Sequence, residues 1–319
     1  MSESSKKIVC VGHTAFDRFY SVDAVVAPPA KVRASAYREM GGGMAGNAAV
    51  AIARLGGNVD FWGPVGDDEI AGRMQADFAQ HGVNATQMRR FTGRTSSHSA
   101  ILVDARGERL IVNVRGDALQ EEASWLPLHE ISHAGALLAD VRWPEGARVA
   151  LGAAHRAGVP SVLDGDMAEH EVLRDLAGRA DYCVFSEPGL AAFTSAGDTR
   201  AGLAEALALG ARSAAVTRGE RGCEWLSAEA PDHLRFMPAF KTTPVDTTGA
   251  GDTFHGAITL LLAEGRPFEQ TLRFASAAAA LKVQRAGARS AREHAACCRE
   301  KRSNSFSCKT TDTALLDAR

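Results

Sequence analysis

The stretch VDTTGAGDTFHGA, residues 245–257, places glycines, hydroxyls and a carboxylate directly before an apolar segment that predicts a helix. Because Gly249, Ala250 and Gly251 precede this helix, their backbone N–H groups can point at one spot, which also feels the positive end of the helix dipole. Such a spot suits an anion, and Asp252 in the first helical turn is placed to take a proton from an attacking hydroxyl. The pattern predicts phosphoryl transfer to an alcohol, which depends mostly on positioning and charge stabilisation.

The alternative interpretation of this stretch is a glycine-rich loop followed by a helix-capping aspartate. A P-loop is excluded, because no Gly-Lys-Ser/Thr follows the glycines. A second glycine-to-helix junction occurs at GGGMAGN, residues 41–47, before a predicted helix of small residues that stops at Gly56 and Gly57.

The composition is that of an ordinary globular chain, with 319 residues, 45% hydrophobic and 23% charged, and a formal net charge of -2. The near-neutral charge predicts no nucleic-acid partner, and no apolar run approaches the ~20 residues of a membrane span. The polar N-terminus lacks the apolar region of a secretory signal. Six cysteines without a CxxC pair predict free thiols in a reduced, cytoplasmic setting.

The elements that must position these residues alternate between short β-branched strands and helices. Residues 8–12 predict a buried first strand, and from residue 137 onward strands and helices alternate regularly. We therefore expect an α/β fold with a doubly wound, mostly parallel sheet flanked by helices. Ligands bind at the carboxyl ends of such strands, where Asp17 is expected, although a simple strand-end turn explains Asp17 as well. Asp164 and Asp166 lie at the end of another strand. They could form a simple tight turn, or they could act near a phosphate or a metal, and the sequence does not favour either interpretation.

The segment from Ile8 to about Arg289 resembles the ribokinase-like (PfkB-type) carbohydrate kinases, through GGGMAGNAAVAIARLGG near the start and DTTGAGDTFHGA near the end. The resemblance implies a doubly wound domain, residues 1–291, with a small β-lid from about 15–40 and 95–116 that closes over a sugar. It also implies ATP and Mg²⁺, a passive monovalent cation such as K⁺, and a homodimer formed through the lid strands. Residues 292–319 depart from the family pattern and are interpreted as a disordered tail or the product of a reading-frame change.

The stretches VGHTAFDRFY, LLADVRW, VLDGD and FSEPGLA are most similar to the bacterial sulfofructose kinases of this family. That subgroup implies transfer of the ATP γ-phosphate to the C1 hydroxyl of 6-deoxy-6-sulfofructose, an anionic ketose of sulfoglycolysis. Alternatives within the family are a ketohexokinase or fructokinase, a fructose 6-phosphate kinase and a nucleoside kinase. An alternative of another class is a non-catalytic sugar-binding regulator.

The resemblance also implies roles for individual residues. Asp252 is the expected general base, and the amides of Gly249, Ala250 and Gly251 form the anion hole. The remaining expected site residues are Asp17, Gly43 and Asn47 at the sugar, Thr217, Gly219, Gly222, Ala275 and Ala279 at the nucleotide, and Asp246 and Thr248 at the monovalent cation.

Three residues are expected to bind the sulfonate of the sugar. Lys31 and Asn113 belong to the two lid segments and Arg142 follows the strand that ends in LLADV, and a sulfonate requires charge-assisted donors of these kinds. The alternative is that Lys31 and Arg142 are solvated surface charges and Asn113 a polar residue of an edge strand. The usual Asn-x-x-Glu motif of the family is Ser186-Glu187-Pro188-Gly189 here, which leaves Glu187 as the candidate for binding Mg²⁺ through water. His255 is expected to pack beside the site without a catalytic role.

Overall fold

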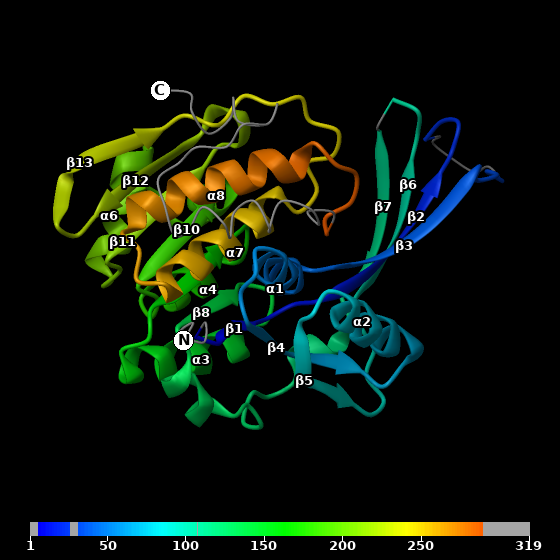
Figure 1. The fold of residues 1–319 in the computed structure, drawn as a ribbon, viewed down its shortest axis with the longest axis horizontal. Helices are drawn as coiled ribbons and strands as arrows, with labels where there is room; N and C mark the ends of the chain where they lie inside the picture. Colours follow the sequence, from blue (N-terminus) through cyan, green and yellow to red (C-terminus); the bar gives the residue numbers. More distant parts are fainter. Residues whose placement is uncertain (1–5, 26–30, 107, 290–319) are drawn as a thin grey trace.

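The computed structural model describes residues 6–25, 31–106 and 108–289. Among these residues, nine strands form one large sheet in the order β13-β12-β11-β10-β9-β8-β1-β4-β5 (Figure 1). Neighbouring strands run parallel from β5 to β11, whereas β12 and β13 are antiparallel additions at one edge. The strands of this sheet are β1 (Ile8–Val11), β4 (Val59–Gly66), β5 (Asn84–Phe91), β8 (Ala136–Asp140), β9 (Ser161–Gly165), β10 (Tyr182–Ser186), β11 (Ser213–Thr217), β12 (Cys223–Ser227) and β13 (Ala230–Met237).

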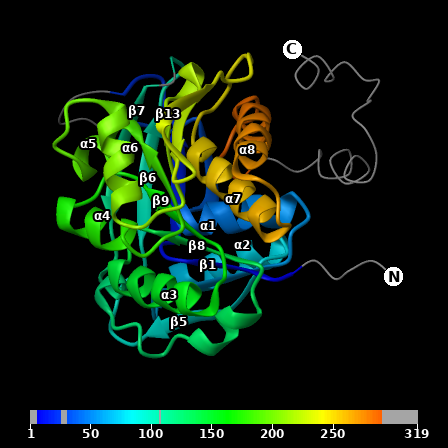
Figure 2. The same ribbon diagram turned by 90° about the vertical axis from the view of Figure 1, so that its left-hand side faces the viewer.

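Helices cover both faces of the large sheet, because its central strands are apolar on both sides. Val9, Val11 and Leu163 pack with helices α3 to α6, and Ile8, Cys10 and Val162 pack toward α1, α2, α7 and α8 (Figure 2). The helices are α1 (Met44–Arg54), α2 (Glu69–Gln80), α3 (Pro144–Ala157), α4 (His170–Ala177), α5 (Glu187–Phe193), α6 (Thr199–Ala208), α7 (Ala250–Ala263) and α8 (Phe268–Val283), with short 3-10 turns η1 (Asp117–Gln120), η2 (Leu128–His133) and η3 (Gly219–Arg221).

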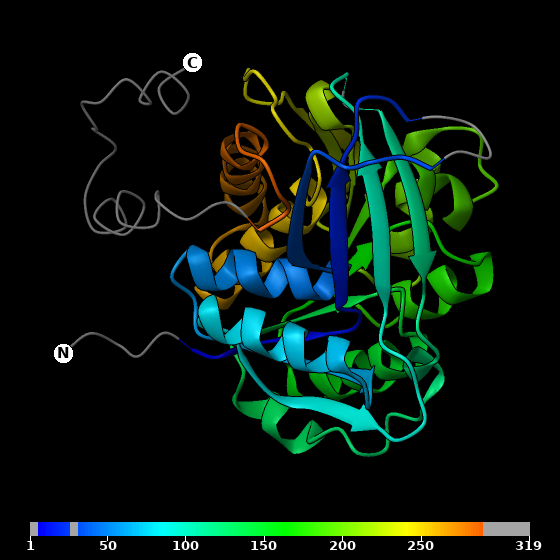
Figure 3. The ribbon, with the colours of Figure 1, turned by 90° about the vertical axis from the view of Figure 1, so that its right-hand side faces the viewer.

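A separate four-stranded sheet, ordered β3-β2-β6-β7, projects from the main body beside α1 and α2 (Figures 1 and 3). Its strands are β2 (Ala15–Ser21), β3 (Ala36–Gly42), β6 (His98–Val103) and β7 (Arg109–Val114). The chain enters β2 directly after β1 and leaves β3 directly before α1, and it returns to this sheet through β6 and β7 after β5. The first strand and the first helix of the main body therefore hold the base of β2 and β3.

The predicted fold class, a doubly wound sheet with a small additional β-sheet, is confirmed. The polar strands β5 and β13 were not predicted. Residues 292–319 lie outside the described residues, so the predicted domain boundary stays a prediction. No helix in the described part of the chain has the length and apolar character that a membrane crossing requires.

Candidate active site

The carboxyl ends of β1, β8, β9, β10 and β11 meet at one edge of the large sheet, because these strands are parallel. The strand order reverses beside β1, and ligands of open α/β sheets bind at such a point. Asp140, the last residue of β8, is fully buried there, and its carboxylate accepts N–H bonds from His13 (2.8 Å), Ala45 (2.9 Å) and Arg142 (2.8 Å). These bonds fix the start of α1 against the ends of β1 and β8.

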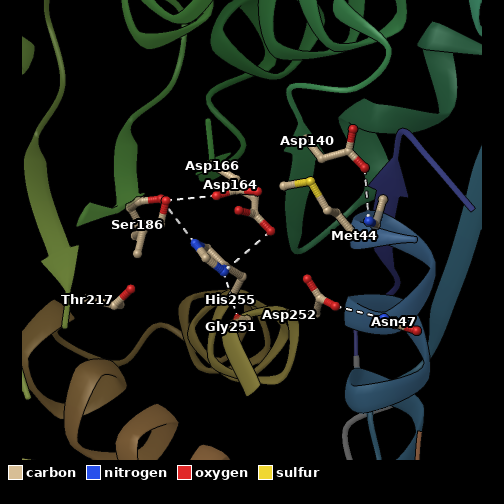
Figure 4. A network of polar contacts seen from close by, with 12 residues as sticks. Met44, Asn47, Asp140, Asp164, Asp166, Ser186, Thr217, Gly251, Asp252 and His255 are labelled. Carbon is tan, nitrogen blue, oxygen red and sulfur yellow. Dashed lines mark hydrogen bonds and ion pairs between the residues drawn. The ribbon is translucent and has the colours of Figure 1, made fainter. Parts of the chain in front are cut away.

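Helix α7 begins at this edge and presents its N-terminus to the same space (Figure 4). Its N-cap, Gly249, has φ 73°, a left-handed conformation that favours glycine, and a Cβ there would also lie 2.9 Å from the Cβ of Ala288. Gly251 is exposed, and a Cβ there would meet no atom within 4 Å. The amide of Ala250 donates to the Thr247 carbonyl at 3.2 Å. The open space over Gly251 at a helix N-terminus is where an anion would bind.

Asp252 lies in the first turn of α7, and its carboxylate points toward α1 (Figure 4). Asn47 of α1 donates from Nδ2 to Asp252 Oδ2 at 2.7 Å. Burial, and next the charge of Asp164, raises the pKa of Asp252 to about 7, although the Asn47 bond favours the ionised form. A carboxyl with this pKa is suited to accept a proton near neutral pH.

Asp164 and His255 form a buried pair beside Asp252, on the side away from Asn47 (Figure 4). His255 Nδ1 lies 2.7 Å from the Gly251 carbonyl and 3.4 Å from Asp164 Oδ2, while Nε2 lies 3.0 Å from the Val184 carbonyl. Burial and the neighbouring carboxylates raise the pKa of Asp164 well above its ordinary value. His255 thus joins α7 to β10 through backbone oxygens, which agrees with the prediction that it packs beside the site.

Asp17, Ser99 and Asn113 form a polar row across the four-stranded sheet, because Asp17 pairs with Ser99 and Ser99 with Asn113 in the strand registers. Asn113 donates to Ser99 Oγ at 3.1 Å, and burial raises the pKa of Asp17 although a bond with Ser99 opposes the shift. Gly42 lies beside Asp17, since a Cβ there would be 2.4 Å from Asp17 Oδ2. Gly43 follows at the N-cap of α1, so this row faces the start of that helix.

Arg142 extends from the carboxyl end of β8 over the strand ends. Its guanidinium donates to Asp166 Oδ2 at 2.9 Å and to the Met167 carbonyl at 3.1 Å, and its Nε lies 3.3 Å from Met44 Sδ. Arg115 donates to the backbone carbonyl of Arg142 at 3.2 Å, so its guanidinium lies against the backbone of the same residue. Among the described residues, neither Lys31, which is exposed between β2 and β3, nor Asn113 bonds to Arg142.

The residues that are expected to bind the nucleotide lie near the edge of the sheet beyond β10. Thr217 ends β11 and donates to the Phe185 carbonyl at 3.3 Å, and Gly219 and Gly222 form the turn into β12. A Cβ at Gly222 would lie 2.1 Å from the Met237 carbonyl, so the turn requires glycine. Ala275 and Ala279 lie on α8 and pack in the same apolar cluster as the start of β12. The turn and the helix therefore border one region next to α7.

Glu187, the candidate Mg²⁺ residue, begins α5 and forms an ion pair with Arg221 and a longer one of 3.8 Å with Arg218. Its charge is already neutralised by arginine, which disfavours a role as a metal ligand. The described residues contain no group of three His, Cys, Asp or Glu side chains that could cage a metal ion.

Sequence reasoning missed Arg289, which is buried behind the site after the end of α8. Its Nε donates to Asn47 Oδ1 at 2.9 Å, and its other nitrogens bond the Gly42 carbonyl and the carboxylate of Asp77. Arg289 thus orients the amide that bonds Asp252 and ties the chain after α8 to the base of the small sheet. The only sequence signal was its place in RAGARS, directly after the predicted last helix.

A family model described as pfkB family carbohydrate kinase matches residues 5–295. The chain belongs to this family. It is 31% identical to the ribokinase of Bacillus subtilis over 286 residues, covering 89% of this chain and 94% of that one, and 31% identical to the ribokinase of Schizosaccharomyces pombe over 264 residues, covering 78% and 82%. The chain is therefore an ATP-dependent phosphotransferase that acts on an alcohol group, not a non-catalytic sugar-binding protein.

Solved structures agree with this assignment. A crystal structure from Agrobacterium tumefaciens, provisionally assigned to the ribokinases, has a TM-score of 0.86 and 36% identity, and the match covers 93% of this chain and 97% of that one. The ribokinase of Arabidopsis thaliana, solved with ribose and ATP, has a TM-score of 0.82 at 24% identity, covering 95% and 100%, and shows the shared fold.

Proposed function

We propose that Asp252 is the general base of this kinase and removes the proton from a sugar hydroxyl as that oxygen attacks the γ-phosphate of ATP. The observation that carries the proposal is the position of this largely buried carboxylate, with a pKa raised to about 7, in the first turn of a helix whose N-terminus faces open space. Developing charge on the transferred group is stabilised by the amides at that N-terminus. Mg²⁺ bound to the nucleotide would neutralise further charge.

The sugar would lie between the polar row of the small sheet and the start of α1. Asp17 would accept bonds from sugar hydroxyls, with Gly43 next to it at the start of α1 and Asn47 oriented toward Asp252. The nucleotide would lie over Thr217, Gly219 and Gly222, with its base near Ala275 and Ala279. Movement of the small sheet over the sugar would exclude water as a competing acceptor.

We propose 6-deoxy-6-sulfofructose, phosphorylated at its C1 hydroxyl, as the substrate. The support is Arg142 at the carboxyl end of β8, with Arg115 beside it. Three of the five guanidinium N–H groups of Arg142 bond within the described part of the chain, which leaves donors for an anion. Lys31 and Asn113 would approach the sulfonate from the small sheet.

Ribose is the second candidate, because the relatives from Bacillus subtilis and Schizosaccharomyces pombe are named ribokinases and the Arabidopsis thaliana structure contains ribose with ATP. A neutral pentose needs no arginine at the carboxyl end of β8, whereas an anionic ketose would use one. Asp166 pairs with Arg142 at 2.9 Å, so a sulfonate would have to share the guanidinium with this carboxylate, whereas a neutral sugar would leave the ion pair undisturbed.

The test of the substrate is ATP turnover with 6-deoxy-6-sulfofructose, fructose, fructose 6-phosphate, ribose and adenosine. We expect the highest kcat/KM for the sulfonated sugar, and Arg142→Ala should lower that value by about 10²-fold, in line with the loss of a charge-assisted bond, while changing the value for fructose little. Arg148→Ala is the matched control, since Arg148 pairs with Asp175 and Glu145 on the outside of α3. Preference for ribose, with Arg142→Ala affecting all sugars equally, would remove the sulfonate from the proposal.

The test of the base is Asp252→Asn, which should lower kcat by about 10²- to 10⁴-fold while leaving ATP binding unchanged. Asp198→Asn is the control, because Asp198 caps α6 by accepting the Ala201 N–H and asparagine caps equally well. Full activity in the Asp252 variant would rule out this base.

We also propose that the chain forms a homodimer through the small sheet. Leu110, Val112 and Val114 lie on one face of its edge strand β7, Tyr37 lies on the same face at the other edge strand, and all four are exposed. An exposed apolar row next to open strand edges fits contact with a second copy.

A further inference from the structure

Lys282 is a lysine with no solvent exposure, in the last turn of α8. Lysine is rarely buried completely, because its ammonium has three N–H donors that must be bonded away from water. Its Nζ donates to the backbone carbonyl of Asp246 at 2.8 Å. A positive charge is therefore fixed inside the protein at the loop that leads into the N-terminus of α7.

Asp246 stands at the centre of this loop, four residues before the first residue of α7. Its Oδ1 accepts the Thr248 N–H at 2.9 Å and its Oδ2 accepts the Gly287 N–H at 2.8 Å. Burial alone would raise the pKa of Asp246, but these amides and the Lys282 ammonium hold that pKa well below its ordinary value. The carboxylate is thus ionised, and the lysine is its cationic neighbour.

The same lysine joins α8 to the loop that shapes the anion site. The Val283 carbonyl, next to Lys282, accepts the N–H groups of Val245 (2.7 Å) and Asp246 (3.0 Å). A few residues further on, Ala288 lies so close to Gly249, the N-cap of α7, that a Cβ on Gly249 would be 2.9 Å from the Ala288 Cβ. A shift of the Lys282 ammonium would therefore also move Gly249 and Gly251, above which the phosphate is expected to bind.

A monovalent cation at Asp246 and Thr248 does not fit this arrangement. Potassium ions bind in proteins where sets of oxygen ligands replace the hydration shell. Here the backbone oxygen of Asp246 accepts an ammonium, and both carboxylate oxygens accept amides. A cation at Asp246 would have to displace a buried, like-charged lysine, which is electrostatically unfavourable.

We propose that Lys282 is a positioning residue that supplies, from within the chain, the positive charge beside Asp246, so that phosphoryl transfer requires no monovalent cation. This inference rests on the kinase activity that family membership gives and not on the identity of the sugar. The lysine would stabilise the ionised Asp246 loop and hold the start of α7 in the geometry that the γ-phosphate requires.

The first experiment uses the unmodified protein in buffer whose only monovalent cation is tetramethylammonium, with MgATP and whichever sugar it turns over. Replacing tetramethylammonium by K⁺, NH₄⁺ or Na⁺ at constant ionic strength should leave kcat unchanged within a factor of about two, since ionic strength alone affects only exposed charges. Activation by K⁺ of tenfold or more would overturn the proposal.

The second experiment uses Lys282→Ala, which removes the ammonium and opens a cavity beside the Asp246 carbonyl. We expect kcat to fall by about 10²-fold through misplacement of the anion site, and K⁺ or NH₄⁺ to restore a large part of it while tetramethylammonium does not. Lys282→Met keeps the length without the charge and should be slow and insensitive to K⁺. Lys7→Ala is the control, because Lys7 pairs with Asp60 and Glu130 away from the site and should gain no cation response.

Thermal unfolding gives a readout that needs no substrate. Potassium should raise the Tm of Lys282→Ala by about 3 °C relative to tetramethylammonium and should not move that of the unmodified protein, because only the variant offers a place that binds the ion in the folded state. If no sugar proves to be a substrate, the proposed substrate is wrong, but the comparison of Tm values in K⁺ and in tetramethylammonium still tests the role of Lys282. A K⁺ shift in the unmodified protein, or full activity of Lys282→Met, would count against the role of Lys282.

Discussion

Asn47 and Asp252, 205 residues apart in the chain, are joined by a 2.7 Å bond from the amide Nδ2 to the carboxylate Oδ2. The other side of the same amide accepts Nε of Arg289 at 2.9 Å. The amide orientation is therefore fixed, with its oxygen toward the guanidinium and its nitrogen toward the carboxylate. Asn47 acts as a connector that brings the N-terminus of α7, the start of α1 and the chain after α8 to one point.

The pH dependence of turnover should follow Asp252. The base must be ionised to accept a proton, so kcat/KM should fall as pH drops through about 7, the value to which burial raises its pKa. The Asn47 bond favours the ionised form, so Asn47→Ala should move this acidic limb to higher pH. Asn84→Ala, which removes a similar bond to Asp60 Oδ1 of 2.9 Å, should leave the limb in place. If the acidic limb of the kcat/KM profile stays at the same pH in Asn47→Ala, the limb reports the titration of a group other than Asp252.

Stability should change with pH in the opposite sense to activity. The folded pKa of Asp252 lies above the ordinary value of an unfolded aspartate, so the folded state binds the proton more tightly between about pH 4 and 7. The unmodified protein should therefore lose stability as pH rises through this window. Asp252→Asn does not titrate and should be more stable at pH 8 by about 4 kcal/mol, with a smaller gain at pH 5. Urea unfolding at both pH values measures this, and equal gains would contradict a buried carboxyl with a raised pKa.

The sequence predicted those parts of the site that depend on local pattern. Glycines before an apolar helix placed Asp252 correctly in the first turn of α7, and short β-branched runs marked the buried parallel strands. Strands β5 and β13 were missed because NATQMRRF and APDHLRFM are polar segments at the two sheet edges, where burial does not impose an apolar pattern.

The residues that connect distant segments could not be predicted from local pattern. Arg289 and Lys282 are a buried arginine and a buried lysine whose partners, Asn47 and Asp246, lie on other elements. In the sequence both resemble ordinary basic residues near a helix C-terminus. Their burial follows from the packing of α8 against α7 and of α7 against α1, which only the tertiary structure reveals.

The space over Gly251 predicts a variant that folds normally and works poorly. A Cβ at Gly251 would meet no protein atom within 4 Å, and alanine is the better helix former, so Gly251→Ala should have an unchanged or higher Tm. The methyl group would point into the place where the transferred phosphate must approach the α7 amides, and kcat should fall by about 10²-fold. Gly72→Ala within α2, whose Cβ would lie 3.6 Å from an Arg90 nitrogen, is the control and should retain full activity. An active Gly251→Ala enzyme would place the anion elsewhere.

The exposed apolar face of the small sheet predicts a variant that would disrupt the proposed dimer. Leu110, Val112 and Val114 project from one face of β7 and are 43%, 58% and 42% exposed, which is unusual for three neighbouring apolar side chains on an edge strand. If a second copy covers this face, Val112→Glu would bury an unpaired charge, and the variant should elute as a monomer in size-exclusion chromatography with light scattering. Phe236→Glu is the control, because Phe236 is 59% exposed on β13 at the far edge of the large sheet and should leave the dimer intact. Because the sugar would bind under the same sheet, the Val112 variant should also show a raised KM for sugar with little change in the KM for ATP. A protein that is already monomeric before mutation would reject the dimer.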